Sequence, residues 1–67
     1  MEEDRLRLEK LLEHWIEHSR EHGESFREWA ERAEEMGLSS AAAHLSEAVE
    51  GMEGVVRSLQ RALKAMK

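Results

Sequence analysis

Apolar side chains recur along the first half of the chain with alternating spacings of four and three residues. Because an α-helix turns by roughly 100° per residue, positions with these spacings lie along one face. The stripe keeps its phase across Gly23, which predicts one uninterrupted helix over about residues 3–36. The members of this first stripe are Leu8, Leu12, Trp15, Ser19, His22, Phe26, Trp29, Ala33 and Met36.

The second half carries a heptad pattern that predicts a second helix over about residues 40–66. Gly37 follows the first stripe and suits the left-handed conformation that ends a helix, while Ser39 or Ser40 is expected to cap the next helix. A connection this short makes the helices antiparallel neighbours, so the expected fold is all-α, a helical hairpin in one domain over residues 1–67. The heptad positions of the second helix are Leu38, Ala41, Leu45, Ala48, Met52, Val55, Leu59, Ala62 and Met66.

Each helix has a second apolar stripe beside the first. One hairpin partner covers one stripe, so the second stripes are predicted to face another copy of the chain in a homodimer that forms a four-helix bundle. The alternative is a monomeric hairpin with an apolar flank. The predicted dimer interface comprises Ile16, Gly23, Ala30, Val49, Val56 and Leu63, with Ala42 on the same stripe.

Composition narrows the classes of function. The chain has 67 residues, no cysteine and a formal net charge of −5. A chain this short needs help from a metal, a partner or very good packing, and disulfides are excluded here. The acidic balance argues against nucleic acid, and no apolar run is long enough to span a membrane. The lack of cysteine fits a cytoplasmic location. No catalytic arrangement of side chains is present, so an enzyme is not expected.

Histidines recur every fourth residue in the stretch EHWIEHSREH, at His14, His18 and His22. Residues four apart lie on one face of a helix, so adjacent histidines can share an ion, and Glu21 stands near enough to add a carboxylate. Imidazole with carboxylate suits Zn²⁺, Ni²⁺ or Co²⁺. The candidate metal ligands are therefore His14, His18, Glu21 and His22, with His14 and His18 the more accessible pair. The competing interpretation is that these histidines only pack or face water.

The position of His22 on the first stripe predicts that it lies inside the bundle. Antiparallel pairing about the turn sets residue i level with about residue 75 − i. A polar layer at mid-bundle is then expected from Ser19, His22, Gly23, Gly51 and Gly54. A neutral, buried His22 would make stability fall below about pH 6. His44 lies far along the bundle from His22 and is expected only to flank its helix.

Residues 8–38 resemble a family of small uncharacterised helical domains from archaea and anaerobic bacteria. The resemblance rests on a pattern close to LLxHWIEHNxEHxExFxxWAxxAxxxGL, in which Ser19 and Gly23 replace the usual Asn and Ala. Many such domains follow a His-rich leader, and some are associated with nickel, cobalt or zinc. The resemblance thus implies metal as a theme. No His-rich run precedes this pattern within the 67 residues, so the metal theme is expected to depend on the three histidines of the first helix.

These observations together predict a self-associating helical-hairpin module, an accessory domain with a divalent-metal site on its first helix. Two other classes stay open: a dedicated metal sensor or carrier, and a purely structural or designed bundle without a ligand. Saturable metal binding would separate the metal classes from the structural one.

Overall fold

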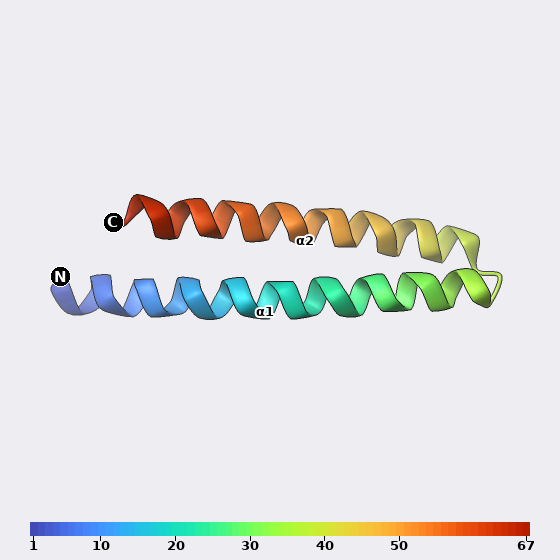
Figure 1. Cartoon of the computed structure of the whole chain (residues 1–67), viewed down its shortest axis with the longest axis horizontal. Coiled ribbons are helices and arrows are strands. Elements are labelled where there is room, and N and C mark those ends of the chain that lie inside the picture. The colour runs from blue at the N-terminus through green and yellow to red at the C-terminus, as the bar shows by residue number, and fades with distance from the viewer.

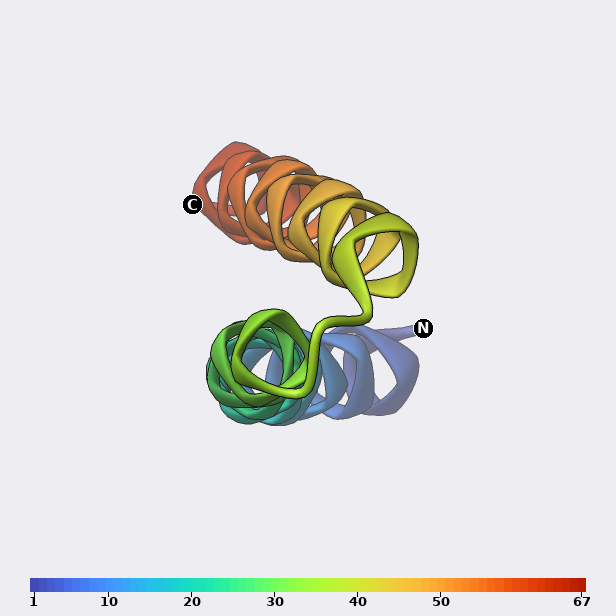
Figure 2. The ribbon, with the colours of Figure 1, turned by 90° about the vertical axis from the view of Figure 1, so that its right-hand side faces the viewer.

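The computed structural model describes all 67 residues as two helices, α1 over Glu2–Glu35 and α2 over Ser39–Ala65. The helices lie side by side and run in opposite directions, so the two termini meet at one end of the molecule (Figure 1). Seen from the turn, they cross at a shallow angle (Figure 2). The predicted all-α helical hairpin is confirmed, and each helix boundary lies within one residue of its predicted position.

The turn between the helices is a Schellman motif centred on Gly37. Gly37 has a φ of 79°, which side chains with a Cβ rarely adopt. The backbone N–H of Leu38 donates to the carbonyl oxygen of Ala33 at 2.9 Å, and that of Gly37 donates to Glu34 at 3.0 Å. The predicted helix stop is therefore confirmed. The predicted serine cap is wrong, because Leu38 is the N-cap of α2 and no side chain caps that helix.

The contact between α1 and α2 uses a different combination of stripes from the one predicted. On the α1 side, the contact is formed by every other residue of the first stripe and by all residues of the second stripe. Written as a heptad, the inward positions are d and a, and the outward members of the first stripe are g. On α1 the inward residues are Leu12, Ile16, Ser19, Gly23, Phe26, Ala30 and Ala33.

The same division holds on α2, where the d and a positions face α1. Those residues are Ala42, Leu45, Val49, Met52, Val56, Leu59, Leu63 and Met66. The residues predicted to meet a second copy thus lie between the helices of one chain: Ile16, for example, is only 7% exposed. Their placement on an intermolecular surface was wrong for this hairpin, because they are used to hold it together.

Side-chain size explains this choice of contact. Gly23, Ala30 and Ala42 are small, and small residues let two helix backbones approach closely, whereas tryptophans at the contact would hold them apart. A Cβ added at Gly23 would lie 3.6 Å from the Cβ of Met52. That contact also confirms the predicted register, since residues 23 and 52 sum to 75.

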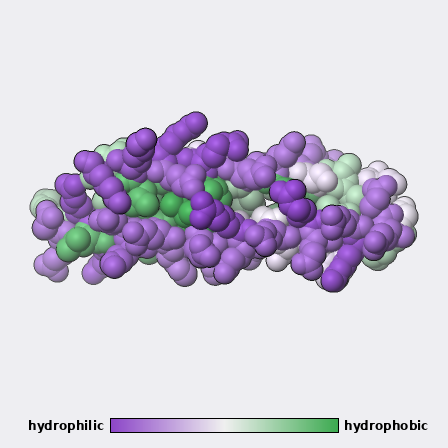
Figure 3. Space-filling view, in the orientation of Figure 1, coloured by the Kyte–Doolittle hydropathy of each residue, from purple (hydrophilic) through white to green (hydrophobic).

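The hairpin is long, thin and sparsely buried. Its principal extents are 52 × 14 × 12 Å. Six residues are buried, all of them apolar, and no large side chain is fully enclosed. Figure 3 shows hydrophobic side chains gathered between the two helices in the half nearer the termini, framed by hydrophilic ones. Neither helix has a stretch of the length and apolar character needed to cross a membrane.

Candidate functional site

The g positions left outside the contact form an exposed apolar surface along α1. They recur every seven residues, and Trp15 and Trp29 remain 41% and 52% exposed. His22 occupies the g position midway between the two tryptophans and is also exposed. Leu11, one helical turn from Leu8 and Trp15, extends the surface. Its residues on α1 are Leu8, Leu11, Trp15, His18, His22, Trp29 and Met36.

The corresponding g positions of α2 carry small residues, namely Ala41, Ala48, Val55 and Ala62. They lie on the same side of the hairpin as the g positions of α1. All three grooves of the molecule are lined by e positions from both helices, so the e positions of α1 and α2 lie on one side of the contact. The g positions of both helices therefore lie together on the other side. We call the surface made by these residues of α1 and α2 the apolar face. It presents bulky side chains on one helix and small ones on the other.

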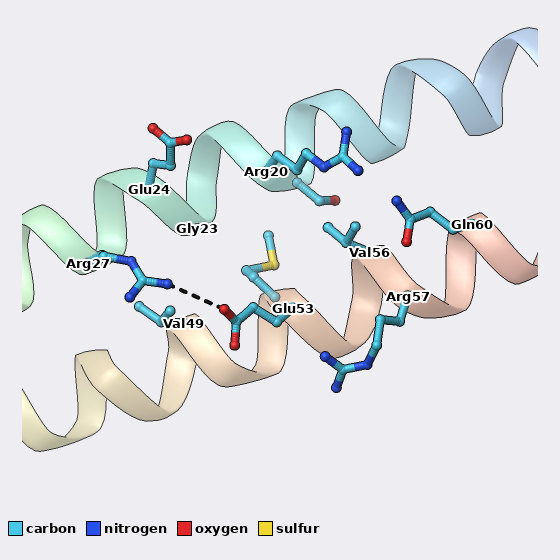
Figure 4. Close-up of a pocket in the computed structure, with 11 residues that line it drawn as sticks. Arg20, Gly23, Glu24, Arg27, Val49, Glu53, Val56, Arg57 and Gln60 are labelled. Carbon is cyan, nitrogen blue, oxygen red and sulfur yellow. Dashed lines mark hydrogen bonds and ion pairs between the residues drawn. The ribbon is translucent and has the colours of Figure 1, made fainter.

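The opposite side of the hairpin is polar. Its largest groove, of about 440 Å³, lies over Gly23 and is crossed by an ion pair in which Arg27 Nη2 is 3.3 Å from Glu53 Oε2 (Figure 4). Arg20 and Gln60 extend toward one another from the two helices beyond that pair. We call this side the polar face. On the polar face, the ion pair between Arg27 and Glu53 bridges the two helices. No such pair bridges them on the apolar face, which is therefore the surface left without a partner.

The histidines of α1 form a ladder along the edge of the apolar face. The ring centroids of His14 and His18 lie 5.1 Å apart and are stacked, and those of His18 and His22 lie 5.2 Å apart, edge to face. The Nδ1 atom of His18 is 3.8 Å from Oε1 of Glu21. The structure therefore brings the predicted ligands next to one another as successive pairs along the helix.

A complete metal site does not form within one chain. No group of three or more His, Asp or Glu side chains is arranged to hold a metal ion. Neighbouring histidines on a straight helix rise by about 6 Å per step, which keeps the ladder from closing around one ion. Water or a second molecule would have to supply the missing ligands.

His22 does not lie in the interior, and this prediction was wrong. Its side chain is exposed, with the ring centroid of Phe26 at 6.1 Å. The expected polar layer is not assembled either, because only Ser19 and Gly23 line the contact and Gly51 is exposed. The reason is that the helices pack through their d and a positions, whereas the prediction placed the d and g positions, and therefore His22, inside. As predicted, His44 stands apart, with its Nδ1 2.6 Å from Oε1 of Glu47.

Sequence reasoning missed the apolar face, although the signal was present. The members of the first stripe alternate between d and g. Every g member is bulky, whereas the d members include the small residues Ser19 and Ala33. From Glu13 onward, the e positions that flank the contact on the other side, including Arg20, Arg27, Glu53 and Gln60, are polar or charged. Leu6, near the N-terminus, is the one apolar residue among them. A comparison of the two flanks would have identified the side of the hairpin left without a partner.

Comparison with known proteins gives a family but no activity. Residues 8–66 match the family described as Domain of unknown function (DUF8180). The matched segment contains both helices almost entirely, with the apolar face and all four histidines. No curated protein and no solved structure matches the chain.

Proposed function

The chain belongs to the DUF8180 family of domains of unknown function, and from that premise we propose that it is a self-associating helical-hairpin module. Its working surface is the apolar face, and the occupant of that surface is a second copy, giving a homodimeric four-helix bundle. The module acts as an accessory domain, and the lack of cysteine is consistent with a cytoplasmic setting.

The observation that carries this proposal is the exposure of two tryptophans on one side of the hairpin. Trp15 and Trp29 lie on the same face as the exposed Leu8, Leu11 and Val55. Exposed apolar side chains aligned along one face mark interaction sites, and tryptophan is among the residues that contribute most to binding at such sites.

The dimensions of the hairpin support a second copy as the occupant. One side of the hairpin, 52 Å by 14 Å in extent, is of the same order of size as the ~800 Å² that each partner buries in a standard protein interface. The hairpin alone encloses no large side chain. Small chains often gain their missing core by oligomerisation.

Sedimentation equilibrium at tens of micromolar tests this proposal. We expect a species of twice the 7.8 kDa chain mass. Trp29→Glu should raise the dimer dissociation constant at least about tenfold, because it puts a charge in the proposed interface. The matched control, Arg20→Glu on the polar face, should leave that constant within about twofold. A 7.8 kDa species for the unmodified chain at 100 µM would refute self-association.

A second candidate function, divalent-metal binding, is favoured by the histidine ladder. His14 and His18 are exposed and adjacent, and Glu21 lies beside His18. Two adjacent imidazoles of one helix, completed by water or by ligands from a second molecule, suit Zn²⁺, Ni²⁺ or Co²⁺. His18 belongs to both histidine pairs, and we assign it the central role.

Calorimetric titration with Zn²⁺ separates this second function from a purely structural module. The unmodified chain should show saturable binding with a dissociation constant below about 100 µM, because adjacent imidazoles act together on one ion. His18→Ala should abolish saturation, while His44→Ala, on the other helix, should not. The absence of saturable heat for the unmodified chain would leave only the self-associating function.

A further inference from the structure

The apolar face also specifies how a second copy sits on it, an inference that rests on the proposed self-association. We propose that the two hairpins are related by a two-fold axis parallel to their helices. In that arrangement α1 of each chain packs on α2 of the other, and both turns lie at the same end of the bundle. The basis is the division of the face into a bulky stripe on α1 and a small stripe on α2.

The side-chain volumes of the two stripes complement each other across the proposed interface. The α1 stripe carries Trp15, Trp29 and Met36, whereas the α2 stripe carries three alanines and a valine. An axis parallel to the helices sets each bulky stripe against the small stripe of the other copy. Both new helix contacts then have the same separation, as rigid hairpins require.

The parallel axis also determines the register between the two hairpins, because it does not allow one copy to shift along the other. The contact between Gly23 and Met52 sets residue i level with residue 75 − i, within one chain and therefore across the axis. Bulky and small residues whose numbers sum to 77 then lie within about 3 Å of each other along the bundle. Across the interface these pairs are Met36 with Ala41, Trp29 with Ala48, His22 with Val55, and Trp15 with Ala62.

The alternative axis, perpendicular to the helices, gives a poorer fit. Centred at His22, it sets Trp15 of one chain against Trp29 of the other and brings the alanine stripes of the two α2 helices together. The α1 helices would then be held apart by two tryptophan pairs, while the α2 helices need close approach to make contact. Two straight hairpins cannot satisfy both separations along their common face.

Distances between spin labels distinguish the two arrangements, since the chain has no cysteine and each introduced one is unique. In Ser39→Cys, at the turn, the parallel axis predicts about 20–30 Å between labels, the width of a bundle. The perpendicular axis separates the same labels by about 42 Å along the bundle, plus its width. Glu24→Cys lies near mid-bundle, where both axes predict a short distance, so it reports dimer formation alone.

A short distance at both positions supports the parallel axis. A short distance for Glu24→Cys with a distance beyond about 40 Å for Ser39→Cys overturns the arrangement but keeps the dimer. No dipolar coupling at either position, with a monomer in sedimentation, removes the proposed function as well. Circular dichroism of both variants, expected to match the unmodified chain, checks that neither substitution disrupts the hairpin.

Discussion

Gly23 shows how a single small residue permits the two helix backbones to lie close together. It stands at an inward a position of α1, where the structure leaves space for a Cβ at 3.6 Å from that of Met52. A glycine in the middle of a helix costs stability relative to alanine because its unfolded backbone has more freedom. Gly23 therefore lowers the stability of its own helix while it allows the two helices to approach closely.

We expect Gly23→Ala to stabilise the hairpin by about 0.5–1 kcal/mol. The new methyl group makes an ordinary van der Waals contact with Met52, and the helix loses a flexible position. The measurement is urea denaturation at fixed chain concentration. Gly54→Ala is the matched control for the change in helix propensity, because its Cβ would make no contact with the other helix and would meet only the end of the Arg57 side chain, at 3.8 Å. A Gly23→Ala chain less stable than the unmodified one would mean that the helices pack more closely than described.

His22 differs from the other histidines in what surrounds it. It lies between Trp15 and Trp29 on the apolar face, whereas His14 is on the outer edge of the ladder. In the hairpin alone its ring is exposed, so the predicted loss of stability in acid has no basis within one chain. In the proposed dimer it enters the interface opposite Val55 of the second copy. The same residue is thus polar surface in one state and part of the interface in the other.

At the scale of the element, the turn is the most strongly specified feature of the chain. The two Schellman hydrogen bonds satisfy carbonyl oxygens at the end of α1, and Gly37 supplies the positive φ that the motif needs. The Leu38 carbonyl then accepts from the N–H of Ala42 at 2.9 Å, which starts α2 at once. Because the connection is so short, it determines the antiparallel pairing of the helices and the register of the contacts between them.

Gly37→Ala should therefore destabilise the hairpin by about 1–2 kcal/mol, since a Cβ is strained at a φ of 79° even though no other atom lies within 4 Å. Thermal unfolding followed by circular dichroism measures the effect. The comparison with Gly54→Ala is informative because the same substitution within a helix should raise the midpoint. A Gly37→Ala midpoint equal to that of the unmodified chain would contradict the role given to this turn.

At the scale of the whole molecule, the two sides of the hairpin differ: side-chain interactions bridge the helices on one side but not on the other. On the polar face Arg27 and Glu53 pair across the helices, and at the open end the side chain of Arg5 donates to the backbone carbonyl of Met66. The apolar face has no comparable bridge and exposes two tryptophans. This difference between the two sides is the reason for proposing self-association rather than ligand binding in an internal pocket.

The amino-acid sequence by itself determined two helices, the turn at Gly37, the antiparallel pairing and its register. These follow from local chemistry: helical periodicity, the conformational freedom of one glycine, and a connection too short to allow another topology. The expectation of a small uncharacterised domain also agrees with the family of unknown function that matches residues 8–66.

Only the tertiary structure decided which side of each helix is inside. A d position lies midway between a and g around a helix, so a seam of a and d residues and a seam of d and g residues have the same spacing along the chain. Periodicity does not separate them. Packing does, because Gly23 and Ala30 at a positions allow an approach that Trp15 and Trp29 at g positions prevent. That choice turned the predicted interior histidine outward and left the bulky stripe exposed.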